Sequence, residues 1–168
     1  MRRILAIITI ALLSACSMTS KTQIIERITF PAHEYEALNK TGNATVSGQV
    51  FMKTRGGDIK YGAGSKVWLN PKTSYSDQWY SVTLSNRFQV DGLGFKKLSD
   101  ADSRLSGYII DTQADGFGNF TFNNVPAGEY YLTSGVTWEA PGGSLQGGLV
   151  VKLVSVNDGD NLKIMLTR

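Results

Sequence analysis

The sequence predicts an all-β sandwich of about seven strands that carries one short inserted helix. Three observations support this prediction. Apolar residues alternate with polar ones in several short runs, as they do in half-buried strands. Turn residues separate the runs, and 18 of the 168 residues are glycine. Few segments have the helical periodicity that would be needed to connect parallel strands.

The first 15 residues are predicted to be a signal peptide and to lie outside the fold. Arg2 and Arg3 give a positive start, and the apolar run over 4–13 is too short for a permanent membrane span. The following Leu13-Ser14-Ala15-Cys16 resembles a bacterial lipobox, in which signal peptidase II cuts before a lipid-modified cysteine. This resemblance implies that Cys16, the only cysteine, is acylated and holds the protein in the bilayer of the cell envelope. The alternative is an ordinary secretory signal that contains a cysteine by chance.

Ser17 follows the lipidated position, and in such lipoproteins an aspartate there would favour the inner membrane. The resemblance therefore implies the outer membrane if the host is Gram-negative. Removal of residues 1–15 leaves 15 basic and 14 acidic residues, a formal charge of +1. A nearly neutral chain lacks the basic tract that nucleic-acid binding requires. One cysteine also excludes an intramolecular disulfide, so a hydrophobic core has to provide the stability.

The mature chain is expected to begin with a lipidated tether over 16–23 and a lead-in segment over 24–43, followed by the domain over 44–168. Within the lead-in, 24–30 is apolar enough for an edge strand or a packed segment, and 33–39 fits one or two helical turns or a loop.

The first strand of the domain is predicted over 44–53, where small and apolar residues alternate with polar ones. The glycine-rich stretch 54–64 is expected to be a mobile connection. In the next strand, 66–70, Val67 and Leu69 share one face and leave Trp68 on the other.

The segment after Ser76 is ambiguous, because its apolar spacing fits both a helix and a strand. We favour a short inserted helix that covers Trp68, with Ser76 or Asp77 as its cap. An irregular loop is expected over 90–104, in which 100–105 could form a helical turn. A strand over 107–112 follows.

Two further strands flank a turn over 123–128. Phe120 and Phe122 share a face in the first strand, and Tyr130 and Leu132 share a face in the second, which could continue to Trp138. The run 145–156 is either buried on both sides or bent by its two glycines. A hairpin turn over 157–160 leads to the last strand, 162–166.

The segment 112–132, TQADGFGNFTFNNVPAGEYYL, resembles the carboxypeptidase regulatory-like domains, which are transthyretin-like β-sandwiches with Greek-key connections. The matching features are an Asp-Gly turn, the Phe-x-Phe strand and the Val-Pro-x-Gly-x-Tyr-x-Leu strand, with two extra residues after the Asp-Gly. Further matches at 46–50 and 64–69 extend the resemblance to about 44–168. It implies a fold and no particular function, because such domains are attached to many different proteins.

The sequence gives little support for catalysis. The only histidine, His33, lies in the lead-in segment, so neither a serine-histidine triad nor the two-histidine zinc site of a carboxypeptidase can be assembled in the domain. Asp111, Asp115 and Asn119 lack the spacing of a calcium loop and are better explained as turn residues. We therefore expect a protein that is no enzyme and that has no cofactor or metal.

Four aromatic residues, Trp68, Tyr75, Trp79 and Tyr80, are the candidate contact residues for a ligand or partner. Flat rings stack on sugar faces and are enriched at protein contact sites. The alternative is that they form a second core beneath the inserted helix. The sequence thus indicates a membrane-anchored, non-catalytic binding or structural module of the cell envelope with a protein or glycan partner. Two other functions stay open, an accessory lipoprotein of an envelope or secretion machine and a small carbohydrate-binding lipoprotein.

Overall fold

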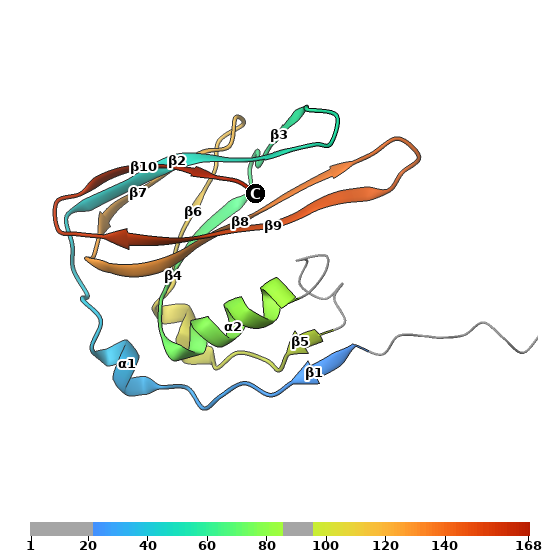
Figure 1. The fold of residues 1–168 in the computed structure, drawn as a ribbon. Coiled ribbons are helices and arrows are strands. Elements are labelled where there is room, and N and C mark those ends of the chain that lie inside the picture. The colour runs from blue at the N-terminus through green and yellow to red at the C-terminus, as the bar shows by residue number, and fades with distance from the viewer. Residues whose placement is uncertain (1–21, 86–95) are drawn as a thin grey trace, which may run out of the picture.

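A computed structural model describes residues 22–85 and 96–168 of the protein. The predicted signal peptide and Cys16 lie outside the described residues. The described chain forms two β-sheets packed face to face and a third, partly helical layer beneath them (Figure 1). Among these residues, no helix combines the length and the hydrophobicity needed to cross a membrane.

The first sheet is built around β2 (Ala44–Lys53), which has the bounds that its alternation predicts. On one side β10 (Asn161–Leu166) runs parallel to β2, and on the other β7 (Asn119–Val125) runs antiparallel. The end of β2 extends beyond these neighbours and forms a hairpin with β3 (Ile59–Tyr61).

The second sheet is antiparallel and has the order β6-β4-β8-β9. Its strands are β6 (Ile110–Gln113), β4 (Lys66–Pro71), β8 (Gly128–Glu139) and β9 (Leu145–Val156). The long β8 and β9 form a hairpin that projects on the same side as the β2–β3 hairpin (Figure 1).

The main core lies between the two sheets, because every strand turns one set of alternating apolar side chains inward. Fully buried residues come from both sheets and include Val46, Val50, Leu166, Val67, Leu69 and Leu132. Seven strands, β2, β4 and β6 to β10, enclose this core, which confirms the predicted all-β sandwich.

The third layer lies against the outer face of the second sheet (Figure 1). It contains the predicted inserted helix, α2 (Ser74–Ser85), and the short helix α1 (Ala32–Glu36) of the lead-in segment. The strand β1 (Gln23–Ile25) pairs in parallel with β5 (Lys96–Leu98), and a 3₁₀ helix, η1 (Ser103–Gly107), follows.

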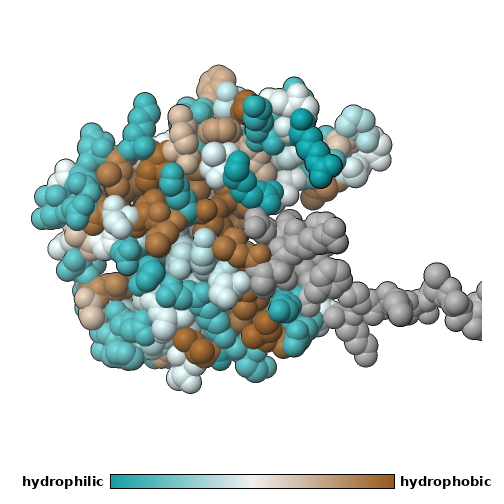
Figure 2. Space-filling model, in the orientation of Figure 1, coloured by the Kyte–Doolittle hydropathy of each residue, from teal (hydrophilic) through white to brown (hydrophobic). Residues whose placement is uncertain are grey.

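A second, aromatic core joins the lead-in segment to α2. The ring of Tyr35, which is fully buried, stacks on Phe30 with 4.6 Å between centroids, and Tyr75 of α2 meets Phe30 edge to face at 5.5 Å. The hydroxyl of Thr73 donates a hydrogen bond to the Tyr35 hydroxyl at 3.0 Å. The lead-in is therefore packed into the structure. In the space-filling view, hydrophobic residues gather mainly between the layers and hydrophilic residues cover most of the margins (Figure 2).

Several of the predicted boundaries are wrong. The helix α2 begins at Ser74, so Ser76 and Asp77 lie inside it, and the hydroxyl of Thr73 accepts the hydrogen bond from the Ser76 N–H at 3.3 Å. The connection 54–64 contains β3, whose alternation is masked by four neighbouring glycines. The loop 90–104 contains β5 among its described residues. The strand expected from 107 begins at Ile110, because η1 occupies the chain up to Gly107. The turn 123–128 is shorter than expected, because β7 continues to Val125.

Candidate functional site

A cavity of about 350 Å³ lies between α2 and the outer face of the second sheet. Trp68 of β4 and Trp79 of α2 both line it. Trp68 reaches this side because Val67 and Leu69 point into the main core. Trp79 lies one helical turn after Tyr75, so both side chains are on the same face of α2.

Polar groups on the sheet complete the cavity. Asn70 follows Trp68 by two residues and therefore shares its face of β4. Its side-chain oxygen Oδ1 is buried and has no hydrogen-bond partner within the described chain. Buried acceptors are almost always paired, so an unpaired one that lines a cavity indicates a place for a donor from a ligand or a water. Thr133, which faces Trp68 across the strand pair, also lines the cavity.

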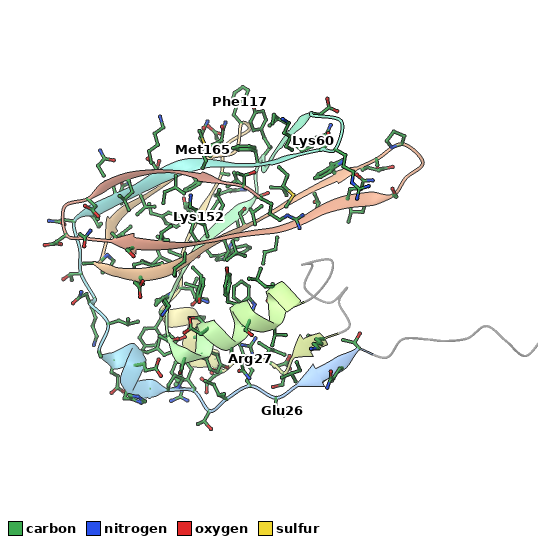
Figure 3. The ribbon with its side chains drawn as sticks, viewed as in Figure 1. Glu26, Arg27, Lys60, Phe117, Lys152 and Met165 are labelled. Carbon is green, nitrogen blue, oxygen red and sulfur yellow. The ribbon has the colours of Figure 1, made fainter. Side chains whose placement is uncertain are left out.

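Arg27 reaches the cavity from the segment after β1 and points toward α2 (Figure 3). Its Nε donates a hydrogen bond to the Ser99 carbonyl at 2.6 Å, and its guanidinium carbon lies 5.2 Å from the centre of the Tyr75 ring. These contacts fix a cation at the edge of a cavity whose walls include three aromatic rings, those of Trp68, Tyr75 and Trp79.

The structure brings three of the four predicted contact residues together and separates the fourth. Trp68, Tyr75 and Trp79 line the cavity, but Tyr75 is only 2% exposed and is chiefly part of the aromatic core. Its hydroxyl accepts a hydrogen bond from the backbone N–H of Asp102 at 2.9 Å. Tyr80 does not line the cavity and stacks on Tyr131 with 4.5 Å between ring centroids.

Tyr131 anchors the sheet to the other side of α2. Its hydroxyl donates a hydrogen bond to Oδ1 of Asp77 at 2.6 Å. Burial raises the pKa of Tyr131 well above its ordinary value, and the carboxylate of Asp77 raises it further. Tyr80 and Tyr131 thus hold the helix on the sheet. For Tyr80, the structure agrees with the alternative that the aromatic residues pack beneath the inserted helix and do not contact a ligand.

A calcium site at the Asp-Gly turn is not supported by the geometry. Oδ1 of Asp115 accepts hydrogen bonds from the backbone N–H groups of Phe117 and Asn119 at 2.8 and 2.9 Å. Together with the side-chain amide of Asn119, which is the largest cause, these bonds lower the pKa of Asp115. Asp111 lies 3.3 Å from the Lys66 ammonium. Over 22–85 and 96–168, no group of three His, Cys, Asp or Glu side chains is placed to hold a metal ion.

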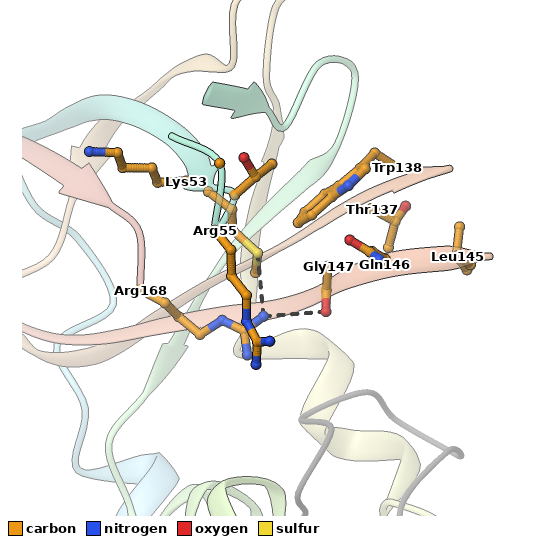
Figure 4. Close-up of a pocket in the computed structure, with 11 residues that line it drawn as sticks. Lys53, Arg55, Thr137, Trp138, Leu145, Gln146, Gly147 and Arg168 are labelled. Atoms are coloured by element: carbon orange, nitrogen blue, oxygen red, sulfur yellow. Dashed lines mark hydrogen bonds between the residues drawn. The ribbon is translucent and has the colours of Figure 1, made fainter. Parts of the chain in front are cut away.

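A second and larger cleft, of about 870 Å³, opens between the β2–β3 and β8–β9 hairpins. Trp138 lies on one wall, and Arg55, Gln146 and Arg168 are among the other lining residues (Figure 4). Sequence reasoning missed this cleft and missed Asn70 and Arg27 in the first. The sequence offered one indication of Asn70: residues two apart in a strand lie on the same face, so Asn70 shares a face of β4 with Trp68.

Comparison with solved structures finds proteins of similar fold. No protein-family model and no curated protein sequence matches the chain. The crystal structure of PA1324, a candidate carbohydrate-binding protein from Pseudomonas aeruginosa, superposes with a TM-score of 0.75 at 33% identity. The match covers 84% of this chain and 99% of that one. The major pilin subunit BcpA of Bacillus cereus matches at 14% identity and a TM-score of 0.39, over 76% of this chain and 29% of that one.

Identity at this level, over almost the whole length of the relative, is accompanied by the same β-rich fold. The chain therefore belongs to the same protein family as PA1324 of Pseudomonas aeruginosa.

Proposed function

We propose that this protein is a non-catalytic carbohydrate-binding lipoprotein of the cell envelope, which holds a short saccharide in the cavity between α2 and the second sheet. The observation that supports it most is the unpaired Oδ1 of Asn70, in a cavity walled by Trp68 and Trp79. The relative PA1324 supports the same class of ligand, since it is itself a candidate carbohydrate-binding protein.

A sugar fits the chemistry of this cavity better than a purely apolar molecule does. One face of a pyranose ring presents C–H groups that pack on a flat indole, and its rim presents hydroxyl donors. Leaving a buried acceptor unpaired costs about 1–3 kcal/mol, and a sugar hydroxyl that donates to Asn70 would recover this energy on binding. The volume of about 350 Å³ lies at the lower end of ligand pockets, which fits a short saccharide.

The substitution Asn70→Leu separates binding from folding. Leucine has nearly the shape of asparagine and removes the unpaired acceptor, so the free protein is expected to be as stable as the wild type or slightly more stable. Binding of a neutral saccharide, selected on a glycan array and measured by calorimetry, is expected to weaken about tenfold through the lost hydrogen bond. Thermal unfolding of the same samples measures the stability.

Two further variants make this result interpretable. Trp79→Leu keeps an apolar side chain on α2 and removes the stacking surface, and it should also weaken binding. Phe117→Ala removes an aromatic ring that is 69% exposed and lies outside the cavity, so it should bind as the wild type does. If Asn70→Leu and Trp79→Leu both bind the saccharide with unchanged affinity, the cavity is not the binding site.

The anchoring part of the proposal concerns Cys16. Each buried methylene of an acyl chain contributes about 0.8 kcal/mol to membrane binding, so two or three chains on one residue hold a protein stably. In cells that express the full chain, Cys16→Ser is expected to move the protein from the membrane fraction to the soluble fraction. The substitution Ser20→Ala, also in the segment ahead of the fold, is the matched control and should leave the distribution unchanged. Equal membrane recovery of Cys16→Ser and wild type would exclude lipid anchoring.

A further inference from the structure

We propose that the cleft between the β2–β3 and β8–β9 hairpins is a second saccharide site, which selects sugars that carry a carboxylate, such as uronic acids. This site does not depend on the cavity beneath α2, because the two share no lining residue. Its features are a concentration of positive charge, one half-buried indole and neutral hydrogen-bonding groups, all within about 870 Å³.

Positive charge is concentrated in this cleft. Lys53, Arg55 and Arg168 line it, and none of the other lining residues is Asp or Glu. These three side chains give the cleft a formal charge of +3. The whole sequence after residue 15 has a formal charge of only +1, from 15 basic and 14 acidic residues. The cleft is therefore more positive than the rest of the chain taken together, and it favours an anionic ligand.

The backbone of β9 holds one of the cations in place. Nη2 of Arg168 donates hydrogen bonds to the Met52 sulfur at 3.4 Å and to the Gly147 carbonyl at 3.3 Å. Gly147 has a φ of +107°, and a Cβ there would lie 2.0 Å from the Val136 carbonyl oxygen, so only glycine fits. Figure 4 shows the side chains of Arg55 and Arg168 extending into the same cleft. A guanidinium group binds a carboxylate with two parallel hydrogen bonds, which an ammonium group cannot do.

The remaining walls fit a sugar ring. Trp138 is half-buried, packs against the main core with one part of its side chain, and lines the cleft (Figure 4). An indole fixed in this way is a rigid stacking surface with little entropy to lose on binding. Thr137 and Gln146, on the facing strands β8 and β9, add neutral donors and acceptors for hydroxyl groups. A simple inorganic anion would use only the cations, whereas an acidic sugar uses all three kinds of group.

The experiment is a titration of the protein with trigalacturonate, with the neutral galactotriose as the paired probe. Trigalacturonate is expected to bind at least tenfold more tightly than galactotriose at low salt, and its affinity should fall as salt is added. Arg55→Gln is expected to weaken the binding of trigalacturonate about tenfold, because one bidentate contact with a carboxylate is lost. Trp138→Leu keeps an apolar side chain against the core but removes the stacking surface. It should weaken the binding of trigalacturonate by roughly fivefold or more.

The matched control is Lys163→Gln, which removes one positive charge from an exposed residue of β10 outside the cleft and should leave the affinity unchanged. Equal binding by Arg55→Gln and Lys163→Gln, equal affinity for the two probes, or absence of trigalacturonate binding would each overturn the proposal. The proposal would also be overturned if an equal concentration of sulfate displaced all bound trigalacturonate and Trp138→Leu left the affinity unchanged. These two results together identify a site for simple anions. Asn70→Leu should bind trigalacturonate normally, so failure of the first site is distinguished from failure of this one.

Discussion

Replacing Gly48 by alanine is expected to destabilise the sandwich by about 4–5 kcal/mol, which is at the exceptional end for one substitution. Gly48 lies in the middle of β2, paired with Ile164 of β10 on one side and Phe120 of β7 on the other. A Cβ at this position would lie 1.9 Å from the Ile164 carbonyl oxygen and 2.8 Å from Cζ of Phe120. The backbone oxygen belongs to β10, which pairs with β2 along its whole length, so it cannot turn away unless β10 and β2 separate.

Urea denaturation followed by tryptophan fluorescence measures this effect. A domain of this size is typically stable by about 5–15 kcal/mol, so the variant should be marginally folded or unfolded at 37 °C. Gly135→Ala is the matched control, because Gly135 also lies within a strand and a Cβ there would meet no atom within 4 Å. That variant should keep or slightly raise the unfolding midpoint, since alanine restricts the unfolded chain. An equal midpoint for Gly48→Ala and wild type would contradict the close approach of β10 to β2.

Period-two alternation was sufficient to predict the strands that bury one face. The bounds of β2 agree with the prediction, because turn residues flank a long alternating run there. The bounds of β9 also agree, but they were set by the turn residues at both ends of an apolar run and not by alternation. The same signal failed for β3, a three-residue strand among glycines, which exists because the end of β2 offers an unpaired edge. Whether a short segment pairs depends on what lies beside it, and this is not encoded in the segment itself.

The candidate sites were harder to predict than the fold. Trp68 and Trp79 could be identified because one lies opposite two core residues and the other lies on a plausible helix. Asn70 could not be identified in this way, because a single asparagine in a strand forms no distinctive sequence pattern. Only the structure shows that its side-chain oxygen is buried without a hydrogen-bond partner. The second cleft brings Arg55 and Trp138 together from hairpins of different sheets, and only the packing of these sheets defines their proximity.

Tyr35→Ala is expected to lower the free energy of unfolding by about 3–5 kcal/mol, the range for removing a buried aromatic ring. Tyr35 is fully buried although it belongs to the lead-in segment, and burial raises the pKa of its hydroxyl. Its ring contacts Phe30 and also Tyr108, at a centroid distance of 4.7 Å. Because Phe30 meets Tyr75 of α2, the loss should loosen the third layer more than the sandwich. Limited proteolysis should then cut near α1 first, and saccharide binding in the cavity beneath α2 should weaken.

Tyr35→Phe removes only the hydroxyl that accepts a hydrogen bond from Thr73, so it should cost about 1 kcal/mol and leave the saccharide site intact. Tyr61→Ala is the control for loss of a tyrosine elsewhere, because Tyr61 is 45% exposed on β3 and should be nearly neutral. If the lead-in were a passive tether, Tyr35→Ala would behave like Tyr61→Ala in both stability and protease resistance. A large difference between them, together with weaker saccharide binding, would instead make the lead-in segment a structural support of the site, because its rings hold the helix that carries Trp79.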